Sequence, residues 1–299
     1  MRRDAKAPEG ANSDDPEARA WRSLLAAAAA TRQGAPPPDL EWLVRLVDAY
    51  ALAADAPEAA RALLELYAPV CLAPAGPSFA VGHLGQSLDG YIATASGDSY
   101  YVTGPENVRH LHRLRALASA VVVGAGTVAR DDPQLTVRHV EGPNPVRVVL
   151  DPTARLDAPR RVFTDGAAPT IVVHAAGLGG RGPGLAEVVE VPADRGRLQL
   201  GVLLERLRER GLASVFVEGG GSTVSRFLEA GLLDRLHVAI APIVLGSGRP
   251  GLTLPARERI AECLRPAHRV FTMGGDVLFD CDLRAAPAAQ AGGTLTRAI

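Results

Sequence analysis

The sequence predicts an α/β protein: a central, mostly parallel sheet flanked by helices, with an antiparallel hairpin near the C-terminus and a helical N-terminal extension. Two observations predict this class. From residue 79 onward, short runs rich in valine and isoleucine alternate with stretches of helical periodicity. Glycine and proline residues interrupt the chain between these runs. Parallel strands need long connections, which helices usually supply, so this alternation favours a parallel sheet.

Residues 1–75 are predicted to form the helical extension. The segments Trp21–Ala30 and Leu40–Leu66 are rich in Ala, Leu, Arg and Glu, which favour helices. Apolar residues recur there at helical spacing, for example at Leu43, Leu46, Val47 and Tyr50. Three consecutive prolines, Pro36–Pro38, separate the two segments, and further prolines and a glycine follow the second. We therefore expect two helices and a domain boundary near residue 76.

The second predicted domain spans residues 76–285. Its expected strands are Phe79–Leu84, Ala120–Gly124, Val146–Leu150, Thr170–His174, Val188–Val191, Ser214–Val217 and Leu236–Ala241. Helices are expected at Arg109–Leu117 and at Leu198–Arg210, where Gly211 provides a stop signal. Val270–Leu283 places Met273–Asp276 between two apolar runs, which predicts the closing hairpin. Residues 286–299 are small and polar, so we expect a disordered tail.

The composition points to a small-molecule partner. The formal net charge is -1 over 299 residues and the basic residues are scattered, so neither nucleic acid nor an anionic membrane surface is expected as a partner. No run reaches the roughly 18 apolar residues of a membrane span, and Met1–Pro16 lacks the apolar core of a signal peptide. Cys71, Cys263 and Cys281 are widely spaced, which predicts reduced, buried thiols and no metal site. We expect a cytoplasmic protein.

A candidate phosphate-binding turn lies at Gly219–Gly221. The expected strand ending in Glu218 runs into these three glycines and then into a helical stretch, Val224–Ala230. Glycines allow the backbone to approach a ligand closely, and a helix N-terminus offers free N–H groups to an anion. The third glycine of the dinucleotide pattern G-x-G-x-x-G is replaced by Val224. A tight strand-to-helix turn without a ligand is the alternative.

Two further segments have functional and structural interpretations. Thr127–Arg138 follows an expected buried strand, so it is predicted to be a loop at the sheet edge where ligands bind in open α/β sheets. Its aspartates, Asp131 and Asp132, are equally typical of turns and caps. Ser87–Thr94 contains Asp-Gly between two extended pieces, and its simplest interpretation is a hairpin.

The order of several short blocks indicates a family. These blocks are Ser87–Gly90, Ala95–Ser99, Val102–Gly104, His112–Ala116, Gly126–Val128, Asp131–Arg138, Arg147–Asp151, Val217–Gly220 and Ala241–Pro242. Together they closely resemble the reductase domain of the bifunctional riboflavin-biosynthesis deaminase/reductase, over about residues 79–283. The resemblance implies a dihydrofolate-reductase-like fold. It also implies NADPH-dependent reduction of a 5-amino-6-(5-phosphoribosylamino)uracil-type substrate to the ribitylamino form.

The resemblance also assigns positions. The implied cofactor-binding residues are Gly85, Tyr101, Thr127, Asp131, Gly220, Gly221, Ser222, Thr223, Val224, Ser225 and Arg226. The implied substrate-binding residues are His83, Ser99, Arg115, Leu135, Arg138 and Glu218. Two guanidinium groups suit a sugar phosphate, so Arg115 and Arg138 are predicted to be a phosphate clamp, although Arg115 could also lie on a solvated helix face. Asp131 and Glu218 are the predicted catalytic residues, Asp131 orienting the nicotinamide or helping to protonate the sugar.

Three departures from the family pattern leave alternatives open. His83 stands where the family usually has a substrate-contacting lysine, and Pro152 stands where a hydroxyl residue often contacts the cofactor. Residues 1–75 hold one cysteine and no histidine, so we expect no deaminase activity. Arg155, Arg160 and Arg161 are candidates for the cofactor 2′-phosphate. The alternatives are a reductase of another pyrimidine or a pterin-like substrate, and a non-catalytic nucleotide-binding protein.

The resemblance implies a homodimer. The extension is expected either to cap the reductase domain or to mediate assembly.

Overall fold

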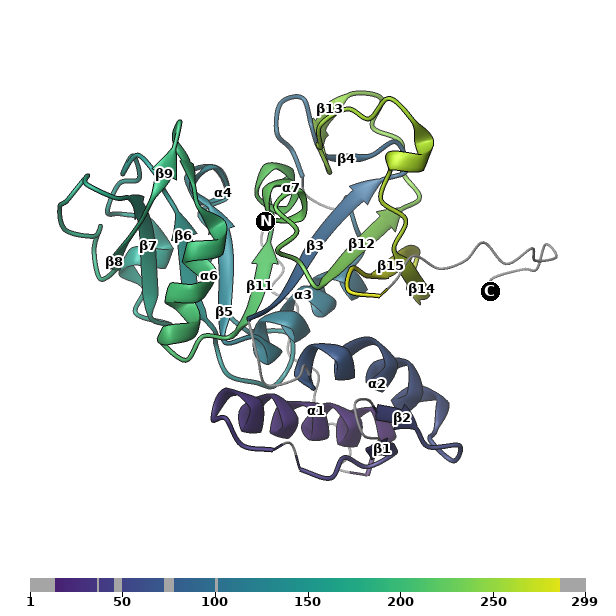
Figure 1. Ribbon diagram of the computed structural model, residues 1–299. Coiled ribbons are helices and arrows are strands. Elements are labelled where there is room, and N and C mark those ends of the chain that lie inside the picture. The colour runs from purple at the N-terminus through teal and green to yellow at the C-terminus, as the bar shows by residue number, and fades with distance from the viewer. Residues whose placement is uncertain (1–13, 37, 46–49, 73–77, 100–101, 286–299) are drawn as a thin grey trace, which may run out of the picture.

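The computed structural model describes residues 14–36, 38–45, 50–72, 78–99 and 102–285 (Figure 1). Within them, a nine-stranded sheet forms the centre of the molecule. Its strands in spatial order are β14 (Ala267–Met273), β15 (Asp276–Asp282), β12 (Arg235–Ala241), β3 (Phe79–Ser87), β11 (Ser214–Glu218), β5 (Ala120–Gly124), β6 (Val146–Leu150), β7 (Thr170–Ala175) and β8 (Glu187–Val191). The strands from β12 to β8 are parallel, and the β14–β15 hairpin closes one edge in antiparallel fashion. The predicted α/β class and C-terminal hairpin are therefore confirmed.

Helices connect the parallel strands. They are α3 (Pro105–Leu117), α4 (Ala125–Asp131), α5 (Arg161–Thr164), α6 (Leu200–Glu209) and α7 (Gly221–Glu229), followed by a 3-10 turn, η1 (Ile260–Glu262). Two short ladders lie outside the main sheet: β4 (Tyr91–Thr94) with β13 (Gly248–Pro250), and β9 (Ala193–Asp194) with β10 (Arg197–Leu198). All seven predicted strands and both predicted helices of this part are confirmed, with ends that differ by a few residues.

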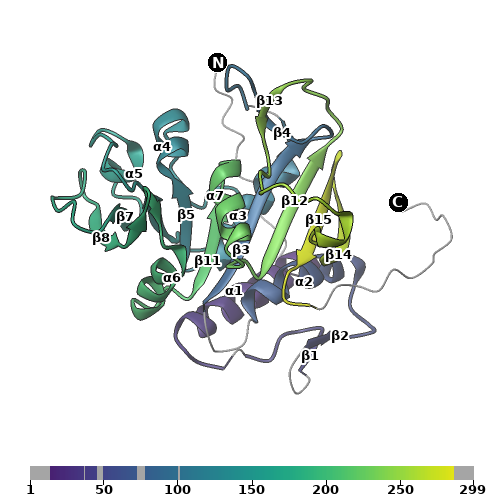
Figure 2. The same cartoon turned by 45° about the horizontal axis from the view of Figure 1, so that its top comes forward.

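The sheet separates two apolar cores. Alternate residues of a strand point to opposite faces, so Val121 and Val123 of β5 join one core while Val122 joins the other. α3 and the N-terminal helices cover the first face, and α6 and α7 cover the second. Figure 2 shows the same layering with the top of the molecule turned forward.

The N-terminal extension holds α1 (Pro16–Arg32) and α2 (Glu58–Cys71), with a short hairpin, β1 (Leu43–Arg45) and β2 (Tyr50–Leu52), between them. Asp15 caps α1 by accepting a hydrogen bond from the Ala18 amide. The two helices lie side by side beneath the sheet (Figure 1). Leu24 of α1 and Leu64 of α2 belong to the same core as Leu114 of α3. The extension is therefore packed onto the rest of the chain.

The predicted helix Leu40–Leu66 is wrong in its first half. Trp42 has a positive φ of 62°, which ends helical geometry there, and Leu43 pairs with Leu52 across the β1–β2 hairpin. The α2 helix begins only after Pro57, whose ring suits a helix start. Leu46, Val47 and the predicted boundary at residue 76 lie outside the described residues, as does the predicted tail.

Two further local predictions need correction. Thr127–Arg138 is not a loop throughout, because α4 covers its first part and ends at Asp132 in the left-handed conformation. Ser87–Thr94 turns at Asp89-Gly90, but β4 pairs with β13 rather than returning along β3. The Asp89 carboxylate explains this pairing, since it accepts hydrogen bonds from the amides of Leu245 and Gly246 and so holds the chain before β13 near the turn. Among the described residues, no helix is long and apolar enough to cross a lipid bilayer.

Candidate active site

A glycine turn joins β11 to α7 at the carboxyl edge of the sheet. Gly219 and Gly220 have φ values of 73° and 42°, a region that side chains disfavour. At Gly221, a Cβ atom would clash with the carbonyl oxygen of Gly251. All three glycines are thus required by the backbone. The turn leaves the first amides of α7 without partners inside the helix, where they can bind an anion.

The start of α4 lies against the same turn. A Cβ on Gly220 would meet Thr127 Oγ1 at 3.1 Å, and one on Gly124 would meet Thr223 Oγ1 at 2.7 Å. Because β5 and β11 are neighbours in the sheet, their carboxyl ends bring the first residues of α4 and α7 together. The structure therefore unites the predicted cofactor residues Thr127, Gly220 and Thr223 in one place.

A buried ion pair lies beside the glycine turn. Arg115 Nε and Nη2 donate to the two oxygens of Glu218 at 2.7 and 2.5 Å, a bidentate geometry. The two side chains are only 8 and 12 % exposed. Arg115 Nη1 also donates to the Thr136 carbonyl at 3.0 Å and lies 3.4 Å from His112 Nε2. Three of the five N–H groups of this guanidinium thus have acceptors within the protein, because His112 accepts the Arg138 amide hydrogen on Nδ1 and so carries its own proton on Nε2.

The loop after α4 presents Arg138. Its backbone amide donates to His112 Nδ1 at 2.9 Å, and its Nη1 donates to Thr136 Oγ1 at 2.6 Å. Within the described part of the chain, no carboxylate lies at ion-pair distance from Arg138, and its side chain is exposed. Partial burial, Arg115 and Arg161 together lower the pKa of Arg138, so several positive charges face this point.

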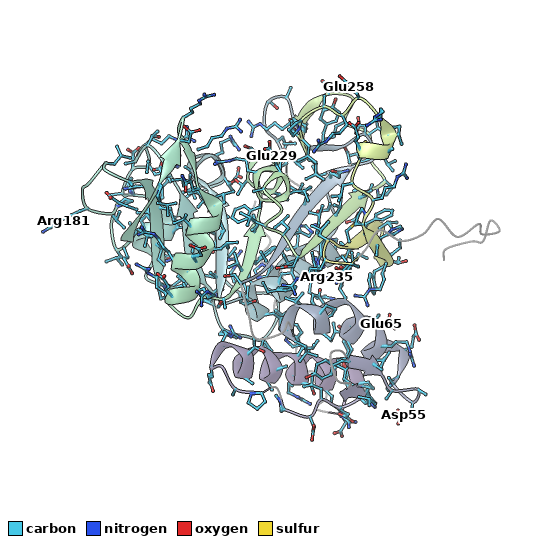
Figure 3. The ribbon with its side chains drawn as sticks, viewed as in Figure 1. Asp55, Glu65, Arg181, Glu229, Arg235 and Glu258 are labelled. Atoms are coloured by element: carbon cyan, nitrogen blue, oxygen red, sulfur yellow. The ribbon has the colours of Figure 1, made fainter. Side chains whose placement is uncertain are left out.

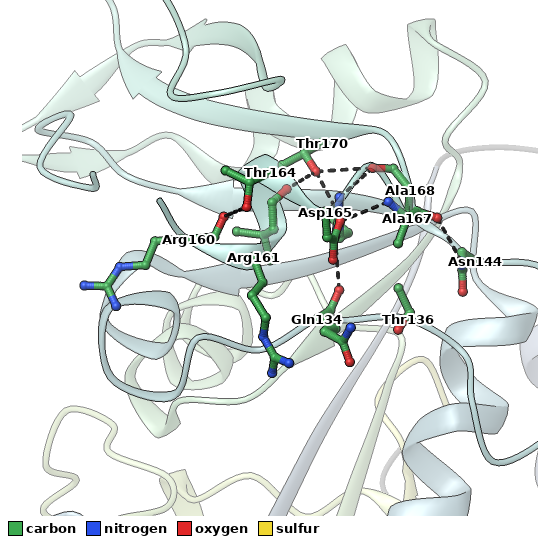
Figure 4. Close-up of polar contacts among 12 residues, drawn as sticks. Gln134, Thr136, Asn144, Arg160, Arg161, Thr164, Asp165, Ala167, Ala168 and Thr170 are labelled. Atoms are coloured by element: carbon green, nitrogen blue, oxygen red, sulfur yellow. Dashed lines mark hydrogen bonds and ion pairs between the residues drawn. The ribbon is translucent and has the colours of Figure 1, made fainter. Parts of the chain in front are cut away.

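A buried arginine on β6 holds that loop in place. Arg147 donates to the carbonyl oxygens of Gln134 and Ala168, to Thr170 Oγ1 and to the Asp165 carboxylate. Figure 4 shows Gln134, Asp165, Ala168 and Thr170 gathered around this point. Leu135, the next residue, has a φ of 56° and is buried. Arg147 therefore fixes the backbone that carries the predicted substrate residues Leu135 and Arg138.

His83 and Gly85 of β3 face the start of α3. His83 is buried, and its Nε2 lies 2.9 Å from Asn107 Oδ1. Burial, with the nearby His237, lowers the pKa of His83 to about 3, so the imidazole is neutral at neutral pH. A Cβ on Gly85 would meet Thr103 Cγ2 at 2.9 Å, so this glycine allows a close approach of the chain before α3. A neutral, hydrogen-bonded imidazole cannot replace the charge of a lysine.

The other predicted residues are more scattered. Asp131 ends α4 and is exposed, and burial of part of its carboxyl raises its pKa. Ser99 is exposed on a loop, and Tyr101 lies outside the described residues. On α7, Ser222 is exposed, but Val224 packs in the core and Ser225 accepts a hydrogen bond from the Thr253 amide. Arg226 donates to the Leu198 carbonyl. Val224 offers a ligand neither its buried side chain nor its amide, which donates to the Gly220 carbonyl.

Sequence reasoning missed two residues that shape the site, His112 and Thr136. His112 accepts the Arg138 amide hydrogen, and Thr136 accepts from both Arg115 and Arg138. His112 lies three residues before Arg115 on the expected helix, a spacing that places both on one face. Nothing local distinguishes Thr136, because Arg115 is distant from it in the sequence. Arg161, a predicted candidate for the cofactor 2′-phosphate, donates to the Asp132 carbonyl.

A cavity of about 780 Å³ lies elsewhere, between α2 and the β14–β15 hairpin. Its lining includes Glu65 and Arg235, which Figure 3 labels at this junction, and none of the predicted site residues. We therefore place the candidate active site at the carboxyl edge of β11 on the geometry above. No group of three or more potential metal ligands occurs in the described ranges, and the predicted absence of a metal stays a prediction. The prediction of buried thiols is wrong for Cys263, which is exposed, while Cys71 is buried and Cys281 is half-buried.

Comparison with known proteins identifies the family of the chain. Residues 81–266 match the family model described as the RibD C-terminal domain. The chain belongs to this family. A 2,5-diamino-6-ribosylamino-4(3H)-pyrimidinone 5′-phosphate reductase of Methanothermobacter thermautotrophicus is 40% identical over 202 residues, covering 65% of this chain and 93% of the relative. The RibD protein of Aquifex aeolicus is 39% identical over 170 residues, covering 54% of this chain and 46% of the relative.

A solved structure supports the same fold. The deaminase/reductase of Thermotoga maritima superimposes with a TM-score of 0.61 at 29% identity, covering 75% of this chain and 61% of that one. The chain thus spans nearly all of the archaeal reductase but only about half of the RibD protein from Aquifex aeolicus.

Proposed function

We propose that this RibD C-terminal domain protein is an NADPH-dependent reductase of a pyrimidine ribosylamine 5′-phosphate in riboflavin biosynthesis. One observation carries the proposal. The carboxyl end of β11 joins the Arg115–Glu218 pair directly to the glycine turn that faces Thr127. A buried ion pair and a glycine turn suited to an anion thus share one strand end, as a substrate and a dinucleotide require. We take residues 76–285 as the reductase domain.

The residues present fit the dinucleotide. Gly219 and Gly220 keep the turn free of side chains, and the first amides of α7 suit the pyrophosphate. Thr127 and Thr223 add hydroxyl groups at the same place. When bound, NADPH supplies a hydride from its nicotinamide ring. The 2′-phosphate needs a basic contact, for which Arg160 and Arg161 remain our candidates.

The protein's own contribution is alignment and charge placement. The reaction forms a C–H bond at the sugar C1′ and opens the ring, whose oxygen takes a proton. Arg115 holds the Glu218 carboxylate in a fixed orientation, which suits hydrogen bonds to the hydroxyl or N–H groups of the substrate. Arg138 is the better phosphate ligand of the two predicted arginines, because Arg115 is already engaged. Asp131, whose pKa is raised by burial, is our candidate for the proton donor.

The decisive experiment is a spectrophotometric assay of NADPH consumption with the purified pyrimidine ribosylamine phosphate. We expect oxidation at 340 nm together with the ribitylamino product in the mass spectrum. NADPH should also raise the melting temperature more than NADH at equal concentration, since a tighter ligand of the native state stabilises it more. An enzyme that consumes no NADPH with this substrate would contradict the proposal. EDTA should leave the rate unchanged.

A second candidate has a specific observation behind it. The neutral, buried His83 occupies the position of the family's substrate-contacting lysine. A reductase of another pyrimidine or a pterin-like substrate would explain that change, and parallel assays with such compounds test it.

We further propose that the protein is cytoplasmic and forms a homodimer. Light scattering of the purified protein tests the second of these.

A further inference from the structure

The extension holds α3 from the side opposite the active site. Arg113 of α3 forms an ion pair with Glu17 of α1. The Arg113 guanidinium also lies 5.7 Å from the ring centre of Trp21 and 5.8 Å from that of Tyr67. These rings themselves meet edge to face at 6.1 Å. Cations over aromatic rings are attractive, more so where water is excluded.

The same extension closes the C-terminal end of α3. Arg32, the last residue of α1, donates to the carbonyl oxygens of Ala116 and Ala118 at 3.3 Å each. The last carbonyls of a helix lack partners within it, and a cation there also suits the helix dipole. α1 and α2 therefore hold both the flank and the end of α3.

A buried hydrogen-bond chain runs from α2 through α3 into the sheet. Tyr67 Oη lies 2.6 Å from His110 Nδ1, and His110 Nε2 lies 3.0 Å from His237 Nδ1. His237 Nε2 lies 3.2 Å from Asp280 Oδ1, a contact that is too bent to count as a hydrogen bond but is electrostatically favourable. Arg235 holds Asp280 from the other side. All members of the chain are buried.

One arrangement of protons is compatible with the two hydrogen bonds of this chain and with the charge of Asp280. Burial alone would raise the pKa of Asp280, but His237 and Arg235 outweigh it and hold the pKa below its usual range, so the carboxylate is charged. Burial lowers the pKa of both His110 and His237, which are therefore neutral at neutral pH. His237 then carries its proton on Nε2, His110 carries its own on Nε2, and Tyr67 donates to His110 Nδ1.

The opposite side of α3 meets the active site. Arg115 of α3 binds Glu218, and Asn107 of α3 lies against His83. Glu218, His83 and His237 occupy matching positions on β11, β3 and β12. α3 therefore lies across one row of polar side chains, Glu218, His83 and His237. The row leads from the candidate site to the histidine that continues the hydrogen bonds of Tyr67 and His110.

We propose that α1 and α2 of the extension support the substrate site from outside it, because they fix the position of α3, and that Tyr67 is a positioning residue that acts through His110. The identity of the substrate rests on the function proposed above. The coupling of the extension to α3 rests only on the contacts just described. This role accounts for an extension that shares a core with α3 without contributing any residue to the site itself.

The test replaces Tyr67 by Phe in the full-length protein, which removes one hydroxyl and keeps the ring. We expect the KM for the pyrimidine ribosylamine phosphate to rise about fivefold with the KM for NADPH unchanged, since displacement of a positioned group weakens only the contacts it makes. Amide hydrogen exchange in α3 should be faster by a similar factor. Nitrogen-15 NMR of the histidine rings should show Nε2–H for His110 in the native protein and loss of that single tautomer in the variant.

The matched control is Arg61→Ala. Arg61 donates to the Ala54 and Ala56 carbonyls and pairs with Glu58, all within the extension, so its loss loosens the extension without touching α3. It should leave the KM, the exchange of α3 and the histidine spectra as in the native protein. Glu17→Gln, at a half-exposed position, is the second variant should Tyr67→Phe not fold, and it should also speed exchange in α3.

Two results would overturn the proposal. One is equal behaviour of Tyr67→Phe and Arg61→Ala in KM and in exchange, which would make the extension a stabiliser only. The other is an Nδ1–H tautomer of His110 in the native protein. If the native protein fails to reduce the pyrimidine phosphate, the proposed function is wrong, while the exchange and NMR measurements still decide the coupling.

Discussion

The two halves of the candidate site are built in different ways. Around Gly219–Gly221, the backbone itself forms the binding surface, and side chains are kept out. Around Arg115, side chains form the surface, and their charges are largely balanced by Glu218 within the protein. The first half needs only a local conformation. The second half depends on residues from α3, β11 and the loop after α4 that meet only when the chain is folded.

This difference separates two arginines that the sequence presents as a pair. Arg115 is buried and engaged with Glu218 and Thr136. Arg138 is exposed and anchored mainly by its backbone. We therefore expect Arg115 to act on stability and geometry, and Arg138 to act on the affinity for the phosphate group. The predictions below test this division.

The largest effect is expected from Arg115→Ala. The change leaves the Glu218 carboxylate buried without a partner, and breaking a buried pair typically costs about 3–5 kcal/mol. Urea unfolding followed by circular dichroism measures the loss of stability. The double variant Arg115→Ala/Glu218→Ala should recover part of it, because no unpaired charge remains. A loss below about 0.5 kcal/mol in the single variant, typical of a surface site, would contradict the role of Arg115 as an internal partner.

Arg138→Ala should leave stability nearly unchanged and weaken substrate binding. A charge-assisted hydrogen bond contributes about 1.5–3 kcal/mol, or about one to two decades in kcat/KM for the phosphorylated substrate. Arg138→Lys should recover part of the loss, because an ammonium keeps the charge but cannot form the two parallel hydrogen bonds of a guanidinium. The dephosphorylated substrate is the control. Equal losses with both substrates would show that Arg138 acts on folding or on the cofactor.

The buried, neutral His83 beside the site predicts how the stability of the protein depends on pH. The pKa of His83 is lowered to about 3 in the folded protein, against about 6.5 when unfolded. The unfolded state therefore binds more protons below pH 6.5, so the stability is fully present above that pH and is lost as the pH falls toward about 3. At pH 5, the cost is about 2 kcal/mol for this group. His83→Gln should flatten the decline in unfolding free energy between pH 7 and pH 5 by about that amount, which urea titrations at both pH values measure.

The sequence predicted what local rules decide. The valine-rich strands and the glycine turn follow from periodicity and from the conformational freedom of glycine, and both are confirmed. Residues 40–57 show the limit. Their helical spacing is real, but Trp42 and Pro57 interrupt it, and the pairing of Leu43 with Leu52 gives a hairpin instead. The engagement of Arg115 with Glu218, 103 residues away, could not be predicted from spacing, because it depends on the strand order.

The smallest effect tests the backbone half of the site. Gly220→Ala adds a methyl group at a φ of 42°, 3.1 Å from Thr127 Oγ1 and over the turn where the cofactor is expected to bind. The Gly220 backbone, with φ 42° and ψ 108°, lies outside the left-handed helical region and is strained for a residue with a Cβ, so stability should fall by about 1–3 kcal/mol. Gly231→Ala is the control. Gly231 has a φ of 65° with nothing within 4 Å of its added Cβ, so the change adds a positive-φ backbone cost away from the glycine turn. If the turn binds NADPH, Gly220→Ala alone should also raise the dissociation constant for NADPH, by about tenfold for a loss near 1.4 kcal/mol. Fluorescence titration of both variants with NADPH measures this. Equal affinities would mean that the turn serves only the connection between β11 and α7.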